Sequence, residues 1–250
     1  MRSNIVCLRA VFIWGVFTCT ASFIIHRTSR HRSNASRSQQ RVSTSSAASI
    51  ESIKDEICKA IAPTERGLKC TKEKQEQIDK LLRKLEDSCQ LSEPARSPYM
   101  AGNWLVEYST APPPSNGKLG PFVGEARQII DLKNKSYINF LSVDPASWLT
   151  AQLSARWEEW DGILLDDNET TSSDIESNRG DFGASSWKVE FLKLEIKLFS
   201  NTVFEKSFEN TARVWKMTYV DELSRIVRAG RTGKDEEDVV FFMSREEQLL

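Results

Sequence analysis

The chain has 250 residues, of which 40% are apolar, and a formal net charge of −1. This length suits one domain with additions or two small domains, and the apolar fraction is sufficient for a packed core. The charge is unevenly distributed: residues 1–50 carry seven arginines and no acid, whereas the remaining 200 residues hold 27 basic and 35 acidic side chains, a net charge of −8. Proteins that bind nucleic acids neutralise the phosphate groups with clustered Lys and Arg. Because residues 51–250 are net acidic, we expect no nucleic-acid partner.

The N-terminal segment is typical of a targeting sequence. Residues 1–22 read as a signal peptide or signal anchor, because an uncharged apolar run from Ala10 to Ile25 follows two arginines. Residues 23–49 are rich in Ser and Arg and lack acids, like a disordered transit peptide. The two together resemble the bipartite presequences of algae with secondary plastids, which implies import into the plastid (chloroplast). The alternative is a membrane anchor in the secretory pathway.

Removal of this presequence would leave no histidine and three cysteines, Cys58, Cys70 and Cys89. Such a chain cannot build a Ser-His-Asp, a Cys-His or a histidine-based metal site. We therefore expect no enzyme activity, no cofactor and no metal. Carboxylates such as Glu107, Glu125 and Asp144 are the remaining catalytic candidates, but no two of them are paired at a meaningful spacing.

Residues 50–96 predict a helical hairpin. Isoleucines recur at three- and four-residue steps from Ile50 to Ile61, and Pro63 ends the run. A second helix begins near Thr71 and carries an apolar stripe made of Ile78, Leu81, Leu82 and Leu85. We expect the hairpin to pack on the domain that follows. The alternative is that the stripe docks a partner protein.

From Gly102 onwards the apolar pattern alternates with a period of two, which predicts strands. In "WKVEFLKLEIKLF" the apolar face changes after Phe191, which predicts a bulge or bend near Phe191 and Leu192. Residues 165–186 read as an acidic, solvated loop. About eight or nine antiparallel strands with short turns predict a mainly β domain over residues 97–250, either a sandwich or an up-and-down barrel.

Three stretches resemble the plastid lipid-associated proteins, also called plastid fibrillins. They are "RGLKCTKEKQEQIDKLLRKLE", "SPYMAGNWLVEYST" and "ARVWKMTYVDELSRIVRAG", in the family's order and spread over roughly residues 50–245. The chain departs from the family pattern at Ala229, which separates Arg228 from Gly230. The resemblance implies an antiparallel lipocalin-like β-barrel of about eight or nine strands, preceded by an N-terminal helical hairpin.

The same resemblance implies a function. Members of this family bind or coat hydrophobic plastid molecules, such as carotenoids, prenylquinones and membrane lipids, without catalysis. The expected partners are therefore a hydrophobic small molecule or lipid, and the surface of thylakoids or plastoglobules. The alternative is a scaffold that docks on a plastid lipid- or quinone-synthesis enzyme through its N-terminal helices.

Gly102-Asn103-Trp104 also resembles the Gly-x-Trp at the first strand of true lipocalins, and this resemblance implies a structural site. In that architecture an arginine of the last strands lies across the tryptophan, and a guanidinium over an indole ring is a favourable pair. We expect Arg225 or Arg228 to stack on Trp104 with Asp221 as charge partner, which would close one end of the barrel. The alternative is an open lipid-headgroup site formed by the same arginines. Burial of the arginines distinguishes the two.

Six aromatic residues are candidates for lining a ligand pocket, although aromatic residues at strand spacing are commonly core. They are Trp104, Tyr108, Phe140, Trp157, Trp215 and Tyr219. Trp157 and Trp160 flank two glutamates, and we expect them to form a rim or a membrane-surface contact.

Overall fold

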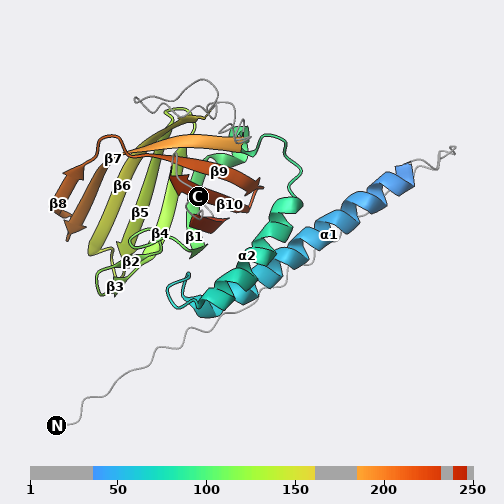
Figure 1. Ribbon diagram of the computed structural model, residues 1–250, viewed down its shortest axis with the longest axis horizontal. Helices are drawn as coiled ribbons and strands as arrows, with labels where there is room; N and C mark the ends of the chain where they lie inside the picture. Colours follow the sequence, from blue (N-terminus) through green and yellow to red (C-terminus); the bar gives the residue numbers. More distant parts are fainter. Residues whose placement is uncertain (1–35, 161–184, 232–238, 247–250) are drawn as a thin grey trace, which may run out of the picture. The chain divides into compact units, whose positions relative to one another are not determined.

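The computed structural model describes residues 36–160, 185–231 and 239–246 (Figure 1). The chain divides into two units, residues 1–42 and 43–250. The described part of the first unit is the beginning of helix α1, and all contacts below lie within the second unit. The predicted presequence up to residue 35 and the acidic loop up to residue 184 lie outside the described residues.

Two helices precede the sheet and lie side by side, α1 (Ser36–Ile61) and α2 (Lys72–Asp87) (Figure 1). Short 3-10 turns follow each of them: η1 (Ala62–Thr64), η2 (Pro94–Arg96) and η3 (Pro98–Met100). Helix α1 begins earlier than predicted, because residues 36–48 contain neither proline nor glycine to end a helix. The Thr71 cap is confirmed, since its hydroxyl accepts a hydrogen bond from the Lys74 amide. Neither described helix has a stretch long and apolar enough to cross a bilayer.

The strands form a closed antiparallel barrel. They are β1 (Gly102–Ser109), β2 (Lys118–Leu119), β3 (Phe122–Val123), β4 (Glu125–Asp131), β5 (Ser136–Val143), β6 (Leu149–Glu159), β7 (Ser186–Leu198), β8 (Asn201–Ser207), β9 (Ala212–Val220), β10 (Ser224–Arg231) and β11 (Val239–Arg245). Eight of them neighbour one another in the order β6-β5-β4-β1-β11-β10-β9-β7, and β6 also pairs with β7. Strand β8 extends the sheet beyond β7, and β2 pairs with β3 alone. The predicted closed barrel behind a helical hairpin is confirmed.

A bulge in β7 allows both of its apolar faces to contribute to the interior. Ala155 pairs with Phe191 and Ser154 pairs with Lys193, so Leu192 is the extra residue. Phe191 before the bulge packs on the main interior cluster, and Ile196 after it packs on a second one formed by β5 and β6. The predicted bulge is therefore confirmed.

Two further bulges turn tyrosines outward. In β1 the extra residue is Glu107, and Tyr108 moves to the outer face of the barrel. In β9 the extra residue is Thr218, and Tyr219 moves outward in the same way. A one-residue insertion reverses the facing of every side chain after it, which explains both displacements.

The barrel consequently has a core on each side of its wall. The interior contains residues such as Trp104, Trp187 and Met217. The outer core joins the helices to the wall and consists of Ile57, Ile61, Ile78, Leu82, Leu85, Tyr108, Tyr219, Ile226, Val240 and Phe242. The apolar stripe of α2 is buried in this outer core, so it is not a free surface for a partner.

Candidate functional site

One end of the barrel is closed around the indole ring of Trp104. The guanidinium carbons of Arg225 and Arg245 lie 4.9 and 4.3 Å from the centroid of this ring. The indole nitrogen donates to the carbonyl oxygen of Met100 at 3.1 Å. Gly102 is required beside them, because its φ is +108° and a Cβ there would lie 2.8 Å from Nη1 of Arg245.

The guanidinium of Arg225 is fully buried, at 0% exposure, with no carboxylate partner among the described residues. Its Nη2 donates to Oε1 of Gln128 and to Sδ of Met243, whereas Nε and Nη1 have no protein partner in the described part of the chain. Burial lowers the pKa of Arg225 to about 9, so the group keeps its charge at neutral pH. The aromatic face of Trp104 offsets part of the cost of burying this charge.

Arg228 lies on the outer face of β10. Its Nε and Nη2 donate to the two carboxylate oxygens of Glu86 at 2.7 and 3.0 Å, and Nη2 lies 2.8 Å from Asp79. Side chains three apart on a strand point to opposite faces, so of Arg225 and Arg228 only Arg225 reaches Trp104. Arg228 instead connects α2 to the barrel wall.

Asp221 connects α1 to the wall in a similar way. Its carboxylate accepts a hydrogen bond from the Tyr219 hydroxyl at 2.5 Å and lies 2.6 Å from Nζ of Lys54. The structure therefore corrects the expected role of Asp221 as charge partner of an arginine. The β9 bulge places Tyr219 on the outer face, and the carboxylate that follows it meets the helix there.

We expect the attachment through Asp221 to be lost in acid. Burial acts to raise the pKa of Asp221, but hydrogen bonds from Lys54, Tyr219 and the amides of Leu223 and Ser224 outweigh it and hold the pKa below its usual value. A carboxyl with a depressed folded-state pKa stabilises the fold above its unfolded pKa of about 3.9, and this stabilisation disappears as the pH falls through the folded pKa.

The measurement is the melting temperature between about pH 6 and pH 2. The wild type should lose more of its melting temperature over this range than Asp221→Asn, which should already melt lower at neutral pH. Parallel curves for the two proteins would contradict this role of Asp221.

The barrel contains a cavity of about 390 Å³ near the end opposite Trp104. Its floor is aromatic: Tyr137 and Trp215 meet edge to face with centroids 4.6 Å apart, and Phe241 follows 6.3 Å from Trp215. The walls come from β6, β7, β10 and β11 and are mainly apolar. Three polar side chains also line the cavity: Ser115, Asn139 and Arg213.

Of the six aromatic residues expected in the pocket, Trp215 lines this cavity. Trp104 lies at the closed end, and Trp157 stacks on Trp187 in the core with centroids 3.9 Å apart. The structure corrects the placement of Tyr108 and Tyr219, which the bulges turn outward onto the helices.

Phe140 is also corrected, because it lies on the outer face of β5 while Tyr137 and Asn139 alternate inward. Both faces of this strand carry apolar residues, so alternation alone did not select Tyr137. Arg245 was missed as well, although it follows Met243 by two residues and so belongs to the same face of β11.

The expected rim residues Trp157 and Trp160 are only 8% and 7% exposed, which corrects that expectation. Exposed apolar residues instead gather at the end of the barrel that holds the cavity. Phe199 and Val203 in the β7–β8 hairpin are 69% and 60% exposed. Together with neighbours from the β2–β3 hairpin, the β5–β6 turn and β8 they form what we call the apolar rim: Phe122, Val123, Trp148, Phe199, Val203 and Phe204.

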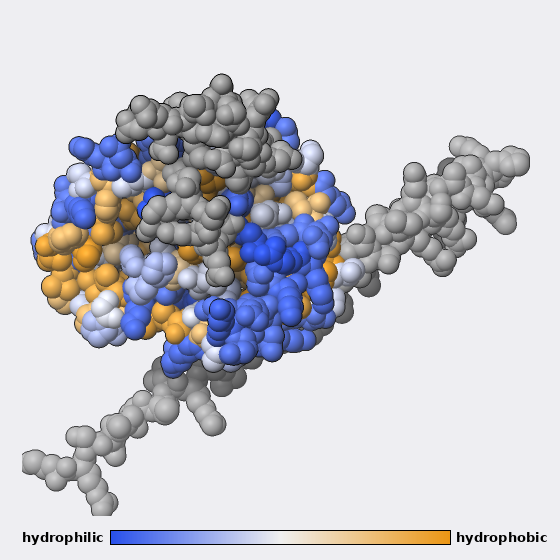
Figure 2. All heavy atoms as spheres, in the orientation of Figure 1, coloured by the Kyte–Doolittle hydropathy of each residue, from blue (hydrophilic) through white to orange (hydrophobic). Residues whose placement is uncertain are grey.

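Three residues of the apolar rim, Phe122, Trp148 and Phe199, form a continuous aromatic cluster. The ring of Trp148 contacts Phe122 and Phe199, with centroids 5.0 and 6.0 Å apart. Figure 2 shows hydrophobic surface gathered over the side of the barrel where β8 lies. Contiguous exposed apolar surface of this kind is typical of a contact with a membrane or a partner.

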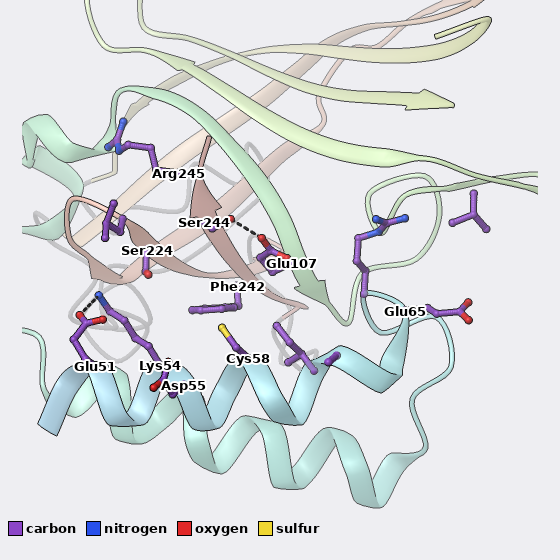
Figure 3. A pocket seen from close by; sticks show the side chains of 15 residues that line it. Glu51, Lys54, Asp55, Cys58, Glu65, Glu107, Ser224, Phe242, Ser244 and Arg245 are labelled. Atoms are coloured by element: carbon purple, nitrogen blue, oxygen red, sulfur yellow. Dashed lines mark hydrogen bonds and ion pairs between the residues drawn. The ribbon is translucent and has the colours of Figure 1, made fainter. Parts of the chain in front are cut away.

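A larger groove, of about 730 Å³, lies outside the barrel between α1 and strands β1, β10 and β11 (Figure 3). Several of its charged side chains have partners: Lys54 lies 2.9 Å from Glu51, and Glu107 accepts a hydrogen bond from Ser244. This charged lining suits a hydrocarbon less well than the barrel cavity does. The described side chains include no group of His, Cys, Asp and Glu that could hold a metal ion.

Comparison with known proteins shows a sequence relative and a family. The chain is 27% identical over 177 residues to "Probable plastid-lipid-associated protein 5, chloroplastic" of Arabidopsis thaliana, which covers 70% of this chain and 64% of that protein. The chain thus spans less than two thirds of the length of this curated relative. The family model described as PAP_fibrillin matches residues 51–235, well over half of the sequence, and the chain belongs to this family.

Proposed function

We propose that the chain is a non-catalytic plastid protein that binds a hydrophobic molecule in its barrel cavity. The observation that carries this proposal is the cavity with its floor of Tyr137, Trp215 and Phe241. Burial of apolar surface contributes about 25 cal/mol per Å², so a hydrocarbon needs no charged contact to bind there. The Arabidopsis relative is named a probable plastid-lipid-associated, chloroplastic protein, and this name supports the same class of ligand and the same compartment.

The size of the cavity limits how much of a ligand it encloses. A water molecule occupies about 30 Å³ of the liquid, and a methylene group is of similar size, so 390 Å³ accommodates about a dozen such groups. The greater part of a membrane lipid chain or the end of a prenylquinone fits this volume. A carotenoid would be enclosed only in part, and its remainder would stay in the thylakoid membrane or plastoglobule.

The test is mass spectrometry of the lipids that co-purify with the full chain. Ala229→Trp fills the cavity and should remove the bound molecule. Ala62→Trp makes the same substitution in the outer groove and should leave the bound molecule in place. Loss of the ligand in Ala62→Trp alone would place binding in the groove and overturn the assignment of the cavity.

We assign the apolar rim to contact with a lipid surface. It lies at the end of the barrel that holds the cavity, so a docked protein would present this end to the membrane that supplies its ligand. Aromatic and aliphatic side chains that are already exposed lose little on entering the headgroup region and gain from leaving water.

Substitution of rim residues should weaken membrane binding without affecting the fold. For the pair Phe199→Asp and Phe204→Asp together, we expect at least a tenfold loss of affinity for phosphatidylcholine vesicles in flotation, because two charges would replace apolar contacts. The matched control is Leu223→Asp, an equally exposed apolar residue at the closed end of the barrel. Equal losses in the control, or none in the rim variant, would refute the assignment.

The alternative role, docking on a lipid- or quinone-synthesis enzyme through the helices, loses its expected surface. Ile78, Leu82 and Leu85 of the α2 stripe are fully buried against the barrel. A partner could use them only after α2 had left the wall.

A further inference from the structure

The barrel interior carries a positive charge that the described chain does not neutralise. Arg225 is fully buried, and no aspartate or glutamate is among the buried residues of the described ranges. Its only protein acceptors there are an amide oxygen and a thioether. Neither carries charge, so the cost of burying this cation is only partly offset.

The described polar atoms of the barrel interior that lack a hydrogen-bond partner are all donors. Unpartnered buried atoms belong to Arg225 (Nε and Nη1), Gln128 (Nε2), Trp157 and Trp187 (both Nε1), within the residues that the structure describes. All five atoms are donors. An interior with surplus donors and a surplus positive charge is complementary to an anionic oxygen acceptor.

The buried charge adjoins the floor of the cavity. Gln128, which accepts from Arg225, lies directly across the β4–β5 ladder from Asn139, a lining residue of the cavity. Tyr137, two residues along β5 on the same face, forms part of the floor; burial raises the pKa of its hydroxyl, and the nearby charge of Arg225 acts to lower it. A group resting on Tyr137 therefore lies in the field of the guanidinium, with little water to screen it.

We propose that the cavity takes a lipid carboxylate head first, with its oxygens at Tyr137 and in the field of Arg225 and its hydrocarbon chain directed toward the apolar rim. This inference rests on the proposed function and specifies its ligand class. The Tyr137 hydroxyl donates to the carboxylate, and Arg225 acts behind it as a positioning residue. The apolar walls accommodate the chain, so charge and hydrocarbon each meet a complementary part of the barrel.

The experiment compares cis-parinaric acid with its methyl ester, which has the same chain without the charge. Fluorescence titration of the full chain should give at least a tenfold tighter dissociation constant for the acid. In Gln128→Glu the protein supplies its own carboxylate to Arg225 at the atom that already accepts from it, and the acid-to-ester preference should fall to about one. Tyr137→Phe should reduce the preference severalfold, because it removes the donor and keeps the ring.

Each other outcome overturns a distinct statement. Equal affinity of the wild type for acid and ester, or an unchanged preference in Gln128→Glu, refutes the carboxylate site while the hydrophobic cavity stands. A preference that survives in Gln128→Glu and disappears in Arg213→Gln places the carboxylate at the other end of the cavity and refutes this placement. Failure of both probes to bind refutes the proposed function, and this inference with it. The melting temperature of Gln128→Glu should equal or exceed that of the wild type, which separates a change of preference from a loss of fold.

Discussion

Replacement of Trp104 by alanine is expected to destabilise the protein by about 3–5 kcal/mol, the range found when a large aromatic side chain is removed from a core. The ring is fully buried and makes contact with the guanidinium groups of both Arg225 and Arg245. Its loss leaves a cavity and also deprives a buried cation of its aromatic face. Urea unfolding, followed by circular dichroism, measures the change in free energy.

Two further variants make this result interpretable. Trp104→Phe keeps an aromatic face and should cost clearly less than alanine. Trp148→Ala removes the same side chain from the apolar rim, where the ring is half-buried, and should cost about 1 kcal/mol or less. Similar losses for Trp104→Ala and Trp148→Ala would show that the closed end carries no special share of the stability.

Replacement of Arg228 by alanine is expected to cost about 3 kcal/mol and to loosen α2 from the barrel. The side chains of Arg228 and Glu86 are 9% and 12% exposed and are joined by two hydrogen bonds. Removal of one member of a buried pair leaves the other charge uncompensated, which is the costly case. Hydrogen exchange should show the amides of α2 losing protection before those of the barrel.

A surface ion pair provides the control for this prediction. Arg156 pairs with Glu190 on the barrel, but its side chain is 68% exposed. Arg156→Ala should therefore change the stability by no more than about 1 kcal/mol. The double substitution of Arg228 and Glu86 by leucine should recover much of the loss, since no buried charge then remains unpaired. A cost for Arg228→Ala as small as that for Arg156→Ala would contradict the role of the pair.

The stretch from Tyr219 to Arg228, which includes the β9–β10 turn, attaches both helices to the barrel. Asp221 forms an ion pair with α1, Arg228 forms one with α2, and Arg225 between them points into the barrel.

The glycine of the Arg66–Gly67 pair, which begins the first stretch that resembles the family, is also explained by the structure. The φ of Gly67 is +94°, and a Cβ there would lie 2.2 Å from the carbonyl oxygen of Ser109, so the connection between the helices can approach β1 only through glycine.

The sequence by itself determined the architecture. Three patterns in the sequence depend on local geometry. Apolar residues recur at three- and four-residue steps before Gly102 and alternate with a period of two after it, and the apolar face changes after Phe191. Each can be read in a window of a few residues, and the antiparallel strands, the two helices and the β7 bulge follow from them. The choice of a barrel over a sandwich came from the resemblance to the plastid fibrillins. The absence of histidine after residue 31 likewise limited the chemistry that the barrel could perform.

Only the tertiary structure decided which residues form the site. The bulges at Glu107 and Thr218 leave no change of apolar pattern, because Tyr108 and Tyr219 find apolar partners on either face once α1 and α2 cover the outer wall. The partner of Asp221 is a lysine from a helix far away in the sequence. The position of the cavity depends on where eight strands together leave space, and this is a property of the closed barrel that no single strand carries.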